Sequence, residues 1–201
     1  MGNNNNNPKK GSHIAADPIT NQEDIERVKQ YLSGSANPRN YAIFVLGINT
    51  NLRISDIRTL TIGQVRGIHP GQDIVLFEKK TGKQRRITVN NAVYLAIAPL
   101  LTSLKDCPPT DPLFQSEKTG NCLTVPTLST LVKTWCRRAK VQKGKFSGHS
   151  MRKAFGYFQR QVFGTPTYLL SEMFNHSSEK ITLKYLGIQP EEIRTAYMNE
   201  I

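Results

Sequence analysis

The sequence predicts a mainly helical fold that carries one small antiparallel β-sheet, the α+β class. Apolar residues recur at spacings of three and four along most of the chain, which is the period of amphipathic helices. Only one stretch, residues 74–89, instead pairs two short β-branched runs around a turn. With 201 residues, the chain is long enough to bury a core without disulfides or a structural metal.

Three helices are predicted before this stretch. Thr20 and Glu23 form a capping box at the start of the first helix, and a Ser-Gly-Ser sequence ends it. Pro38 suits the first turn of the second helix, which is apolar and closes at residues 49–51. The predicted ranges are Asn21–Leu32, Tyr41–Ile48 and the short Ile54–Leu60.

A β-hairpin is predicted next. Its strands are Ile74–Phe77 and Arg86–Val89, and the polar loop between them contains Thr81 and Gly82. This is the clearest strand signal in the chain, so we expect one small sheet built from these two strands.

Helical periodicity resumes after the hairpin. Over Pro126–Ala139 the apolar residues fall at i, i+3, i+4, i+7, i+8 and i+11, a stripe that faces a core. Trp135 and Cys136 belong to this stripe, so neither needs a functional role. The predicted helices are Ala92–Leu104, Pro126–Ala139, Met151–Val162 before Gly164, a helix through Leu169–Phe174 capped by Thr165 and Pro166, and Glu179–Leu186 before Gly187.

Residues 1–16 are expected to lie outside the fold. They begin MGNNNNNPKKGSH, a low-complexity stretch that cannot pack and that indicates an unstructured leader or a cloning remnant. Residues 17–201 then form one domain. No apolar run approaches the ~18 residues of a membrane span and no signal peptide is recognisable, so we expect a cytoplasmic protein without membrane contact. The three cysteines lack CxxC spacing, which favours reduced thiols over disulfides or a zinc site.

The charge distribution indicates a polyanionic partner. Lys and Arg number 27 against 15 Asp and Glu, a net charge of +12. No acidic residue lies between Glu117 and Glu172, while basic residues are frequent there. The alternative is a solvated basic surface, but so long an acid-free stretch favours a face that follows phosphates, with nucleic acid ahead of an anionic membrane. The predicted DNA-binding residues are Lys133, Arg137, Lys140, Lys143 and Lys145 in this stretch, with Lys79, Lys83 and Arg85 at the hairpin.

Five separated places combine a reactive or charged side chain with a helix end or the hairpin. Each has a structural explanation when taken alone: Arg53, for example, can pair with Asp56. Together they describe a phosphoryl-transfer site in which two arginines clamp the phosphate oxygens, a phenol attacks and a lysine protonates the leaving alkoxide. The four histidines lack HxxxH spacing and paired acids, so we expect no metal and no cofactor. The five places are Arg53 in LRISD, the hairpin sequence KKTGK around Lys80, His149 and Arg152 in HSMR, His176 in NHSS, and Tyr185.

In order and spacing these motifs resemble the tyrosine recombinase, or phage integrase, family over about residues 19–201. The resemblance implies the catalytic-domain fold of that family. It also implies a site-specific DNA recombinase or integrase that cleaves and rejoins duplex DNA through a 3′-phosphotyrosyl intermediate. The implied roles are phosphate binding for Arg53 and Arg152, general acid for Lys80, assistance in proton transfer for His149, a hydrogen bond to the phosphate for His176, and nucleophile for Tyr185.

The sequence departs from the family pattern in three respects. Asn175 replaces the glycine usual before the second histidine, but Asn also tolerates a left-handed backbone. Lys153 stands where a histidine often follows the arginine. The family usually carries an N-terminal helical DNA-binding domain, which the stretch before Pro18 is too short to form. We therefore expect either a catalytic-domain piece or an unusually small recombinase.

The resemblance also defines partners and rival functions. Recombination implies duplex DNA, a homotetramer on that DNA, accessory DNA-bending proteins and association with the nucleoid, and the Pro190–Ile201 segment is expected to pack on a neighbouring protomer. A type IB topoisomerase shares the nucleophile and arginines but tends to carry lysine at the position of His149. A non-catalytic DNA-binding regulator on the same fold is the other alternative, and the intact set of site residues argues against it.

Overall fold

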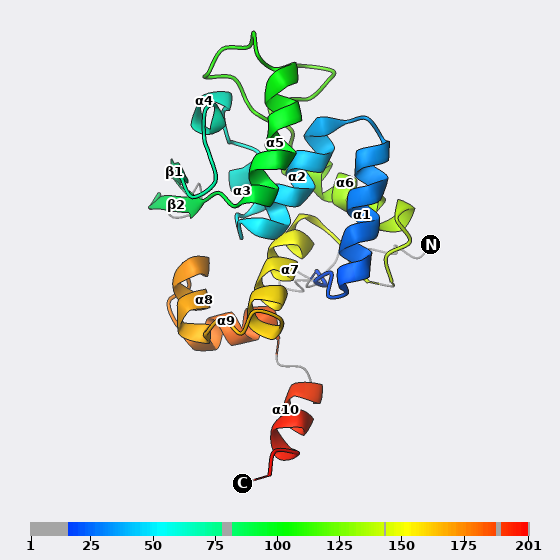
Figure 1. The fold of residues 1–201 in the computed structure, drawn as a ribbon, viewed down its shortest axis with the longest axis vertical. Coiled ribbons are helices and arrows are strands. Elements are labelled where there is room, and N and C mark those ends of the chain that lie inside the picture. The colour runs from blue at the N-terminus through cyan, green and yellow to red at the C-terminus, as the bar shows by residue number, and fades with distance from the viewer. Residues whose placement is uncertain (1–15, 78–81, 143, 188–189, 201) are drawn as a thin grey trace, which may run out of the picture.

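Helices make up most of the described chain, and one two-stranded sheet accompanies them (Figure 1). The computed structural model describes residues 16–77, 82–142, 144–187 and 190–200, and it confirms the predicted α+β class. The elements are α1 (Gln22–Gly34), α2 (Pro38–Asn49), α3 (Ile54–Ile57), α4 (Ile62–Val65), β1 (Asp73–Phe77), β2 (Gln84–Thr88), α5 (Asn91–Ser103), α6 (Val125–Arg138), α7 (Gly148–Gln161), α8 (Thr167–Phe174), α9 (Glu179–Leu186) and α10 (Pro190–Tyr197).

One predicted helix cap is wrong, and a second is confirmed only for one of its two residues. The first helix is capped by Asn21 instead of Thr20, because the Asn21 side-chain oxygen accepts a hydrogen bond from the Glu23 backbone N–H at 2.7 Å. The hydroxyl of Thr165 does not cap α8, because it donates to Gln159 Oε1 at 2.7 Å. The N-cap of α8 is Pro166, and no side chain caps it.

Three short elements differ from the sequence prediction. The predicted Ile54–Leu60 helix ends at Ile57, where i to i+3 hydrogen bonds such as that from Leu60 N to Ile57 O replace the helical pattern. The helices α4 and α10 are not predicted by the sequence. The first has only four residues, which is too short for a helical period to show.

The predicted β-hairpin is confirmed. Strands β1 and β2 pair antiparallel, with Asp73 opposite Thr88 and Phe77 opposite Gln84. The second strand begins two residues earlier and ends one residue earlier than predicted. Ile74 lies opposite Ile87, and both are buried, so the hairpin is anchored to the core by this pair.

The main core surrounds α2, which α1, α5 and α7 cover in Figure 1. Phe44 of α2 contacts Trp135 of α6 edge to face, with ring centroids 6.4 Å apart. Trp135 and Cys136 are buried there, as predicted. Burial raises the pKa of the Cys136 thiol to about 12, so this thiol stays protonated at neutral pH.

A second, smaller apolar cluster joins the three helices that carry the C-terminal motifs. It contains Phe155 of α7, Leu170 and Phe174 of α8, and Leu186 of α9. This cluster fixes α8 and α9 against α7, while α10 lies apart from the other helices in Figure 1. In the described parts of the chain, no helix is both long and apolar enough to cross a membrane.

Candidate active site

Arg53 is placed by a tight turn after α2. Asn51 adopts a left-handed backbone with φ of 49° and donates its side-chain N–H to the carbonyl of Met173 at 2.7 Å. This turn buries Leu52 and puts Arg53 at the N-cap of α3. The Arg53 guanidinium lies 4.0 Å from the buried carboxylate of Asp56, so the predicted structural ion pair is present. The positive charge of Arg53 also lowers the pKa of His149 and opposes the rise in the pKa of Tyr185.

Arg152 lies on the buried face of α7. Its side chain is only 3% exposed, because Met151, Ala154 and Phe155 around it pack into the core. Its Nη2 donates to the carbonyl of Phe174 at 3.0 Å, and its guanidinium carbon lies 4.7 Å from the centre of the Phe174 ring. A buried arginine keeps its charge, so this helix brings a fixed cation into the site.

His149 lies in the first turn of α7, after the N-cap residue Ser147. Partial desolvation lowers the pKa of His149 below 6.5, and the neighbouring charges of Arg152, Lys153 and Arg53 lower it further. Both predicted phosphate-binding arginines therefore act on the same imidazole. The ring is neutral at neutral pH and can accept a proton.

His176 follows the end of α8. Asn175 ends this helix with φ of 53° and ψ of 47°, so the expectation that Asn takes the left-handed position of the family's glycine is confirmed. His176 Nδ1 lies 2.9 Å from the hydroxyl oxygen of Thr182. The imidazole ring lies 5.5 Å from the ring of Tyr185, centre to centre, which brings the fourth and fifth motifs together.

Tyr185 is the penultimate residue of α9, and its hydroxyl oxygen is buried. Desolvation raises the pKa of the phenol above its usual value of 10, while the charge and hydrogen bond of Arg152 and the charge of Arg53 oppose this. Lys153 lies with its ammonium 5.3 Å from the centre of the ring. The nucleophile predicted from the sequence is therefore a neutral phenol surrounded by cations.

Phe174 holds the site together, a role that the sequence did not indicate. It is fully buried, and its ring contacts Arg152, His176 and Tyr185 at centre distances of 4.7, 5.3 and 5.5 Å. The apolar period of α8 predicts that Phe174 is buried but not what it touches. The only local signal is its position directly before the Asn175-His176 motif.

The hairpin is linked to the same place through Arg85. Its Nη2 donates to the Met173 carbonyl at 2.6 Å, so this one carbonyl accepts hydrogen bonds from Asn51 and Arg85. Through the Met173 carbonyl, the final turn of α8 contacts both the turn before Arg53 and the hairpin. Through the Phe174 carbonyl, it also contacts Arg152 of α7. Lys80, the predicted general acid, and Lys79 lie outside the described residues.

Comparison with known proteins decides the family. The model for the phage integrase family matches residues 19–192. The chain belongs to the phage integrase family. A protein of Bacillus subtilis (strain 168) named "Probable integrase/recombinase YoeC" is 32% identical over 182 residues, which cover 90% of this chain and 94% of that protein. "Tyrosine recombinase XerC" of Caldanaerobacter subterraneus subsp. tengcongensis is 25% identical over 179 residues, and the matched part spans 87% of this chain but only 48% of XerC.

Solved structures show the same fold. The crystal structure of XerA recombinase has a TM-score of 0.72 and 20% identity, covering 97% of this chain and 68% of that one. XerH site-specific recombinase, bound to a palindromic difH substrate after cleavage, has a TM-score of 0.75 and 19% identity, covering 90% and 52%. The predicted family, its catalytic-domain fold and the assignment as a site-specific recombinase or integrase that breaks and rejoins DNA are confirmed. Neither the topoisomerase nor the regulator alternative is favoured.

In this phage integrase family member, the predicted DNA-binding residues fall into two groups. Those near α6 are exposed at the surface, and Lys133 and Arg137 line a hollow of about 530 Å³. Those at the hairpin, Lys83 and Arg85, line a second hollow of about 190 Å³ together with Asn175. The exposed residues of the first group are Lys133, Arg137, Lys140 and Lys145, while Lys143 lies outside the described residues. Their contact with DNA stays a prediction.

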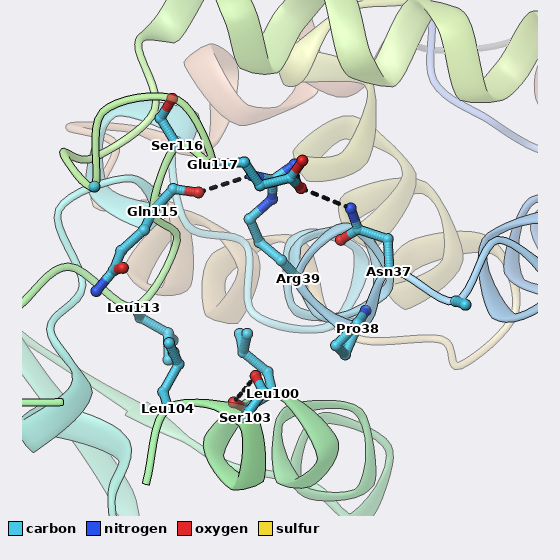
Figure 2. A pocket seen from close by; sticks show the side chains of 12 residues that line it. Asn37, Pro38, Arg39, Leu100, Ser103, Leu104, Leu113, Gln115, Ser116 and Glu117 are labelled. Carbon is cyan, nitrogen blue, oxygen red and sulfur yellow. Dashed lines mark hydrogen bonds and ion pairs between the residues drawn. The ribbon is translucent and has the colours of Figure 1, made fainter. Parts of the chain in front are cut away.

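Another hollow, of about 450 Å³, lies between the start of α2 and the end of α5 (Figure 2). Leu100 and Leu113 form part of its lining, and Arg39 donates to the Gln115 carbonyl at 2.7 Å and lies 3.2 Å from Glu117. None of the predicted catalytic residues lines it, so it is not part of the family's site. Among the described residues there is also no group of three His, Cys, Asp or Glu that could hold a metal ion.

Proposed function

We propose that Tyr185 attacks one phosphodiester of duplex DNA while Arg53 and Arg152 hold its non-bridging oxygens. A bond forms from the Tyr185 oxygen to phosphorus as the bond from phosphorus to the 5′ oxygen breaks. The products are a 3′-phosphotyrosyl link and a 5′-hydroxyl, and the reverse reaction with another 5′-hydroxyl rejoins the DNA without a cofactor. The observation that supports this best is the buried Tyr185 hydroxyl beside Arg152 and within the electrostatic reach of Arg53.

Two arginines suit the phosphate because their charge is permanent and their planar donor groups match its oxygens. In the transition state, negative charge increases on those oxygens, and preorganised cations stabilise it most where water is excluded. The carbonyl and the ring of Phe174 hold the Arg152 guanidinium in a fixed orientation. Arg53, at the start of α3, is held by its ion pair with the buried Asp56. Both arginines are therefore held in place in the protein without DNA.

The proton transfers follow from the charges around each group. Tyr185 loses its proton as it attacks, and His149 is neutral and able to accept it because partial desolvation and nearby cations lower its pKa. His176 donates a hydrogen bond to the phosphate. The leaving 5′ oxygen takes a proton from Lys80, at the hairpin that Arg85 ties to α8.

The DNA partner is supported by charge and by similar proteins. Two of the similar structures are XerH bound to its difH substrate and a lambda integrase dimer bound to a core site. By analogy, this chain binds duplex DNA as a multimer, through the exposed basic residues of α6 and the hairpin. It acts on DNA of the nucleoid with the help of accessory DNA-bending proteins.

A tetramer would require contacts between protomers, and α10 is suited to supply them. Tyr197 and Met198 are 86% and 73% exposed on this C-terminal segment. The junction of α7 and α8 also exposes large apolar side chains, among them Phe163 and Tyr168. Packing α10 of one protomer on this junction of the next would bury both surfaces and link four active sites in a ring.

Covalent trapping tests the proposed reaction. A library of duplexes with randomised sequence, each nicked a few nucleotides from the centre, loses the short strand after cleavage and traps the enzyme on the DNA. We expect a covalent band on a denaturing gel for the unmodified chain and for Tyr168→Phe, whose tyrosine is exposed, but none for Tyr185→Phe. DNA affinity should hardly change in either variant, because many contacts supply it. A band of equal intensity with Tyr185→Phe would falsify the assignment of the nucleophile.

A further inference from the structure

The imidazole of His176 is joined to a chain of buried hydroxyl groups. Its Nδ1 lies 2.9 Å from Thr182 Oγ1, and Thr182, three residues before Tyr185 in α9, is completely buried. Thr182 Oγ1 lies 2.9 Å from Ser171 Oγ in α8. Ser171 Oγ in turn lies 3.0 Å from the backbone carbonyl oxygen of Thr167. A continuous chain of hydrogen bonds therefore joins the Thr167 carbonyl of α8, through the hydroxyls of Ser171 and Thr182, to the imidazole of His176.

The direction of each hydrogen bond follows from the end of this chain. A carbonyl oxygen only accepts, so the single hydroxyl proton of Ser171 points to Thr167. Ser171 Oγ must then accept from Thr182, which uses the only proton of the Thr182 hydroxyl. The contact between Thr182 Oγ1 and His176 Nδ1 is left with one donor, the N–H of Nδ1.

We propose that Thr182 and Ser171 are positioning residues that hold His176 in the tautomer protonated at Nδ1. In this neutral tautomer Nε2 carries the lone pair, and it can donate to a phosphate oxygen only when the ring is protonated. His176 then brings a positive charge to the phosphate together with its hydrogen bond. The catalytic consequence rests on the proposed role of His176 in DNA cleavage, whereas the tautomer itself does not.

Nitrogen NMR of the protein without DNA tests the tautomer directly. With ¹⁵N-labelled histidine at alkaline pH, where imidazoles are neutral, two-bond proton correlations distinguish a protonated Nδ1 from a protonated Nε2. The signal of His176 among the four histidines is the one that disappears in His176→Asn. We expect Nδ1 to carry the proton in the unmodified chain. Protonation at Nε2 would overturn the proposal.

Three variants and a control test the role of the chain. Ser171→Ala does not touch the ring, but it removes the acceptor of the Thr182 proton, so that proton turns toward His176 and the tautomer shifts to Nε2–H. Thr182→Val shifts it in the same direction by removing the acceptor for Nδ1–H, whereas Thr182→Ser keeps the hydroxyl and the tautomer. Thr165→Val is the control, because its hydroxyl bonds Gln159 near the other end of α8. A tautomer that is unchanged in both Ser171→Ala and Thr182→Val would also overturn the proposal.

Single-turnover cleavage separates the tautomer from its catalytic use. Loss of a group that orients a metal-ligating histidine typically lowers activity by about 10- to 100-fold, and we take the same range for the group that orients His176, because the Nε2–H tautomer would bring no positive charge to the phosphate. We expect Thr182→Val to lower the cleavage rate by about that factor at unchanged DNA affinity, and Thr182→Ser to restore it. If the tautomer shifts in the NMR experiment but the cleavage rate does not fall, the tautomer assignment is correct and the proposed contact of His176 with the phosphate is wrong.

Discussion

Phe174 holds Arg152 in two ways at once: its carbonyl accepts a hydrogen bond from Nη2 at 3.0 Å, and its ring lies 4.7 Å from the guanidinium carbon. The first contact fixes one edge of the guanidinium and the second fixes its plane. The orientation of the arginine is therefore set before any substrate arrives. Such preorganisation lowers a barrier because the cation does not have to reorganise during the reaction.

This relationship predicts different effects for the two partners. Phe174→Leu keeps the carbonyl but removes the ring under the guanidinium, an interaction of about 0.5–2 kcal/mol, so cleavage should fall by roughly 2- to 30-fold. Arg152→Lys removes both the planar stacking and the paired donors, and its rate should fall by about 100-fold or more. Single-turnover trapping of the folded protein measures both.

The matched control for this pair is Phe44→Leu. Phe44 is equally buried but packs on Trp135 in the main core, away from the site. Phe44→Leu should lower the free energy of unfolding, but the molecules that remain folded should cleave DNA at the unmodified rate. An Arg152→Lys variant with the full cleavage rate would show that a point charge is sufficient at this position.

Tyr185 and His149, the two ends of the proposed first proton transfer, are both neutral in the protein without DNA. Burial raises the pKa of Tyr185 above 10, whereas partial desolvation and the charges of Arg152, Lys153 and Arg53 lower the pKa of His149 below 6.5. Titration of His149 by NMR should therefore show a midpoint below 6.5. Arg152→Gln should move it upward, because one of the opposing charges is removed.

The same shifts determine how stability changes with pH. Below pH 6.5 the unfolded chain protonates His149 while the folded protein resists, so this residue contributes a loss of stability as the pH falls. Above pH 10 the unfolded chain ionises Tyr185 first, so stability falls as the pH rises. The free energy of unfolding, measured against pH, should fall less at acidic pH in His149→Gln and less at alkaline pH in Tyr185→Phe than in the unmodified chain. In the NMR titration, a midpoint of His149 above 6.5 would contradict the neutral imidazole that is proposed to accept the proton.

Gly156 determines how closely α9 approaches α7. A Cβ at this position would overlap the side chain of Leu186 and lie 2.9 Å from Phe174 Cζ. Alanine normally stabilises a helix by ~1 kcal/mol relative to glycine, whereas overpacking typically costs about 1–3 kcal/mol. We therefore expect Gly156→Ala to lower stability slightly and cleavage strongly, because Phe174 and α9 position Tyr185, the proposed nucleophile.

Gly34→Ala is the control for this substitution. Gly34 is the last residue of α1, and nothing lies within 4 Å of a Cβ there. It should leave cleavage unchanged and raise stability by a few tenths of a kcal/mol to about 1 kcal/mol. Thermal denaturation and covalent trapping of both variants compare the two sites. Full cleavage by Gly156→Ala would mean that α9 tolerates displacement.

The sequence predicted those features of the site that depend on neighbours in the chain. The apolar stripe predicts the helix that carries Arg152, but it puts Arg152 on the opposite face, whereas the structure buries this residue. Asn175 is expected to tolerate the left-handed turn that the structure shows. Tyr185 was placed on its own helix by Ser178, which caps α9. Each of these predictions uses spacings of a few residues, which local backbone geometry determines.

The contacts that assemble the site join residues far apart in the chain, and no local pattern contains them. Arg152 meets Phe174 across 22 residues, and Arg85 and Asn51 reach the Met173 carbonyl across 88 and 122 residues. Sequence periodicity shows that Phe174 is buried but not which cation lies over its ring. The Thr20 cap fails because the next residue, Asn21, accepts the hydrogen bond from the Glu23 backbone N–H. The Thr165 cap fails for a non-local reason, because its hydroxyl bonds Gln159 of α7.

The basic residues of α6 and the following turn predict a measurable salt dependence. Replacing Lys133, Arg137, Lys140 and Lys143 by alanine should weaken binding to all DNA sequences about equally. The log–log dependence of affinity on salt should become shallower by roughly one unit for each ion pair with a phosphate that the substitutions remove. Lys29→Ala is the control, because this lysine pairs with Glu26 at 2.7 Å on α1. Unchanged affinity and slope in the fourfold variant would mean that these residues form only a solvated surface.

Lys80 is predicted to protonate the leaving 5′ oxygen, and sulfur substitution can separate this role from simple charge. Expelling an alkoxide without a proton donor should slow cleavage by about 10²- to 10⁴-fold, so Lys80→Ala should be slow on ordinary DNA. A 5′ bridging sulfur leaves as a thiolate, whose conjugate acid has a pKa near the ~8.5 of a cysteine thiol and which needs no proton. On that substrate Lys80→Ala should cleave nearly as fast as the unmodified chain.

Arg53→Ala, the control for this test, should gain far less from the sulfur substrate, because the proposed contacts of Arg53 are with the non-bridging oxygens. If Lys80→Ala stays slow on the sulfur substrate, Lys80 only positions the phosphate, and selective rescue of Lys79→Ala, Lys83→Ala or His149→Ala would identify that residue as the general acid instead.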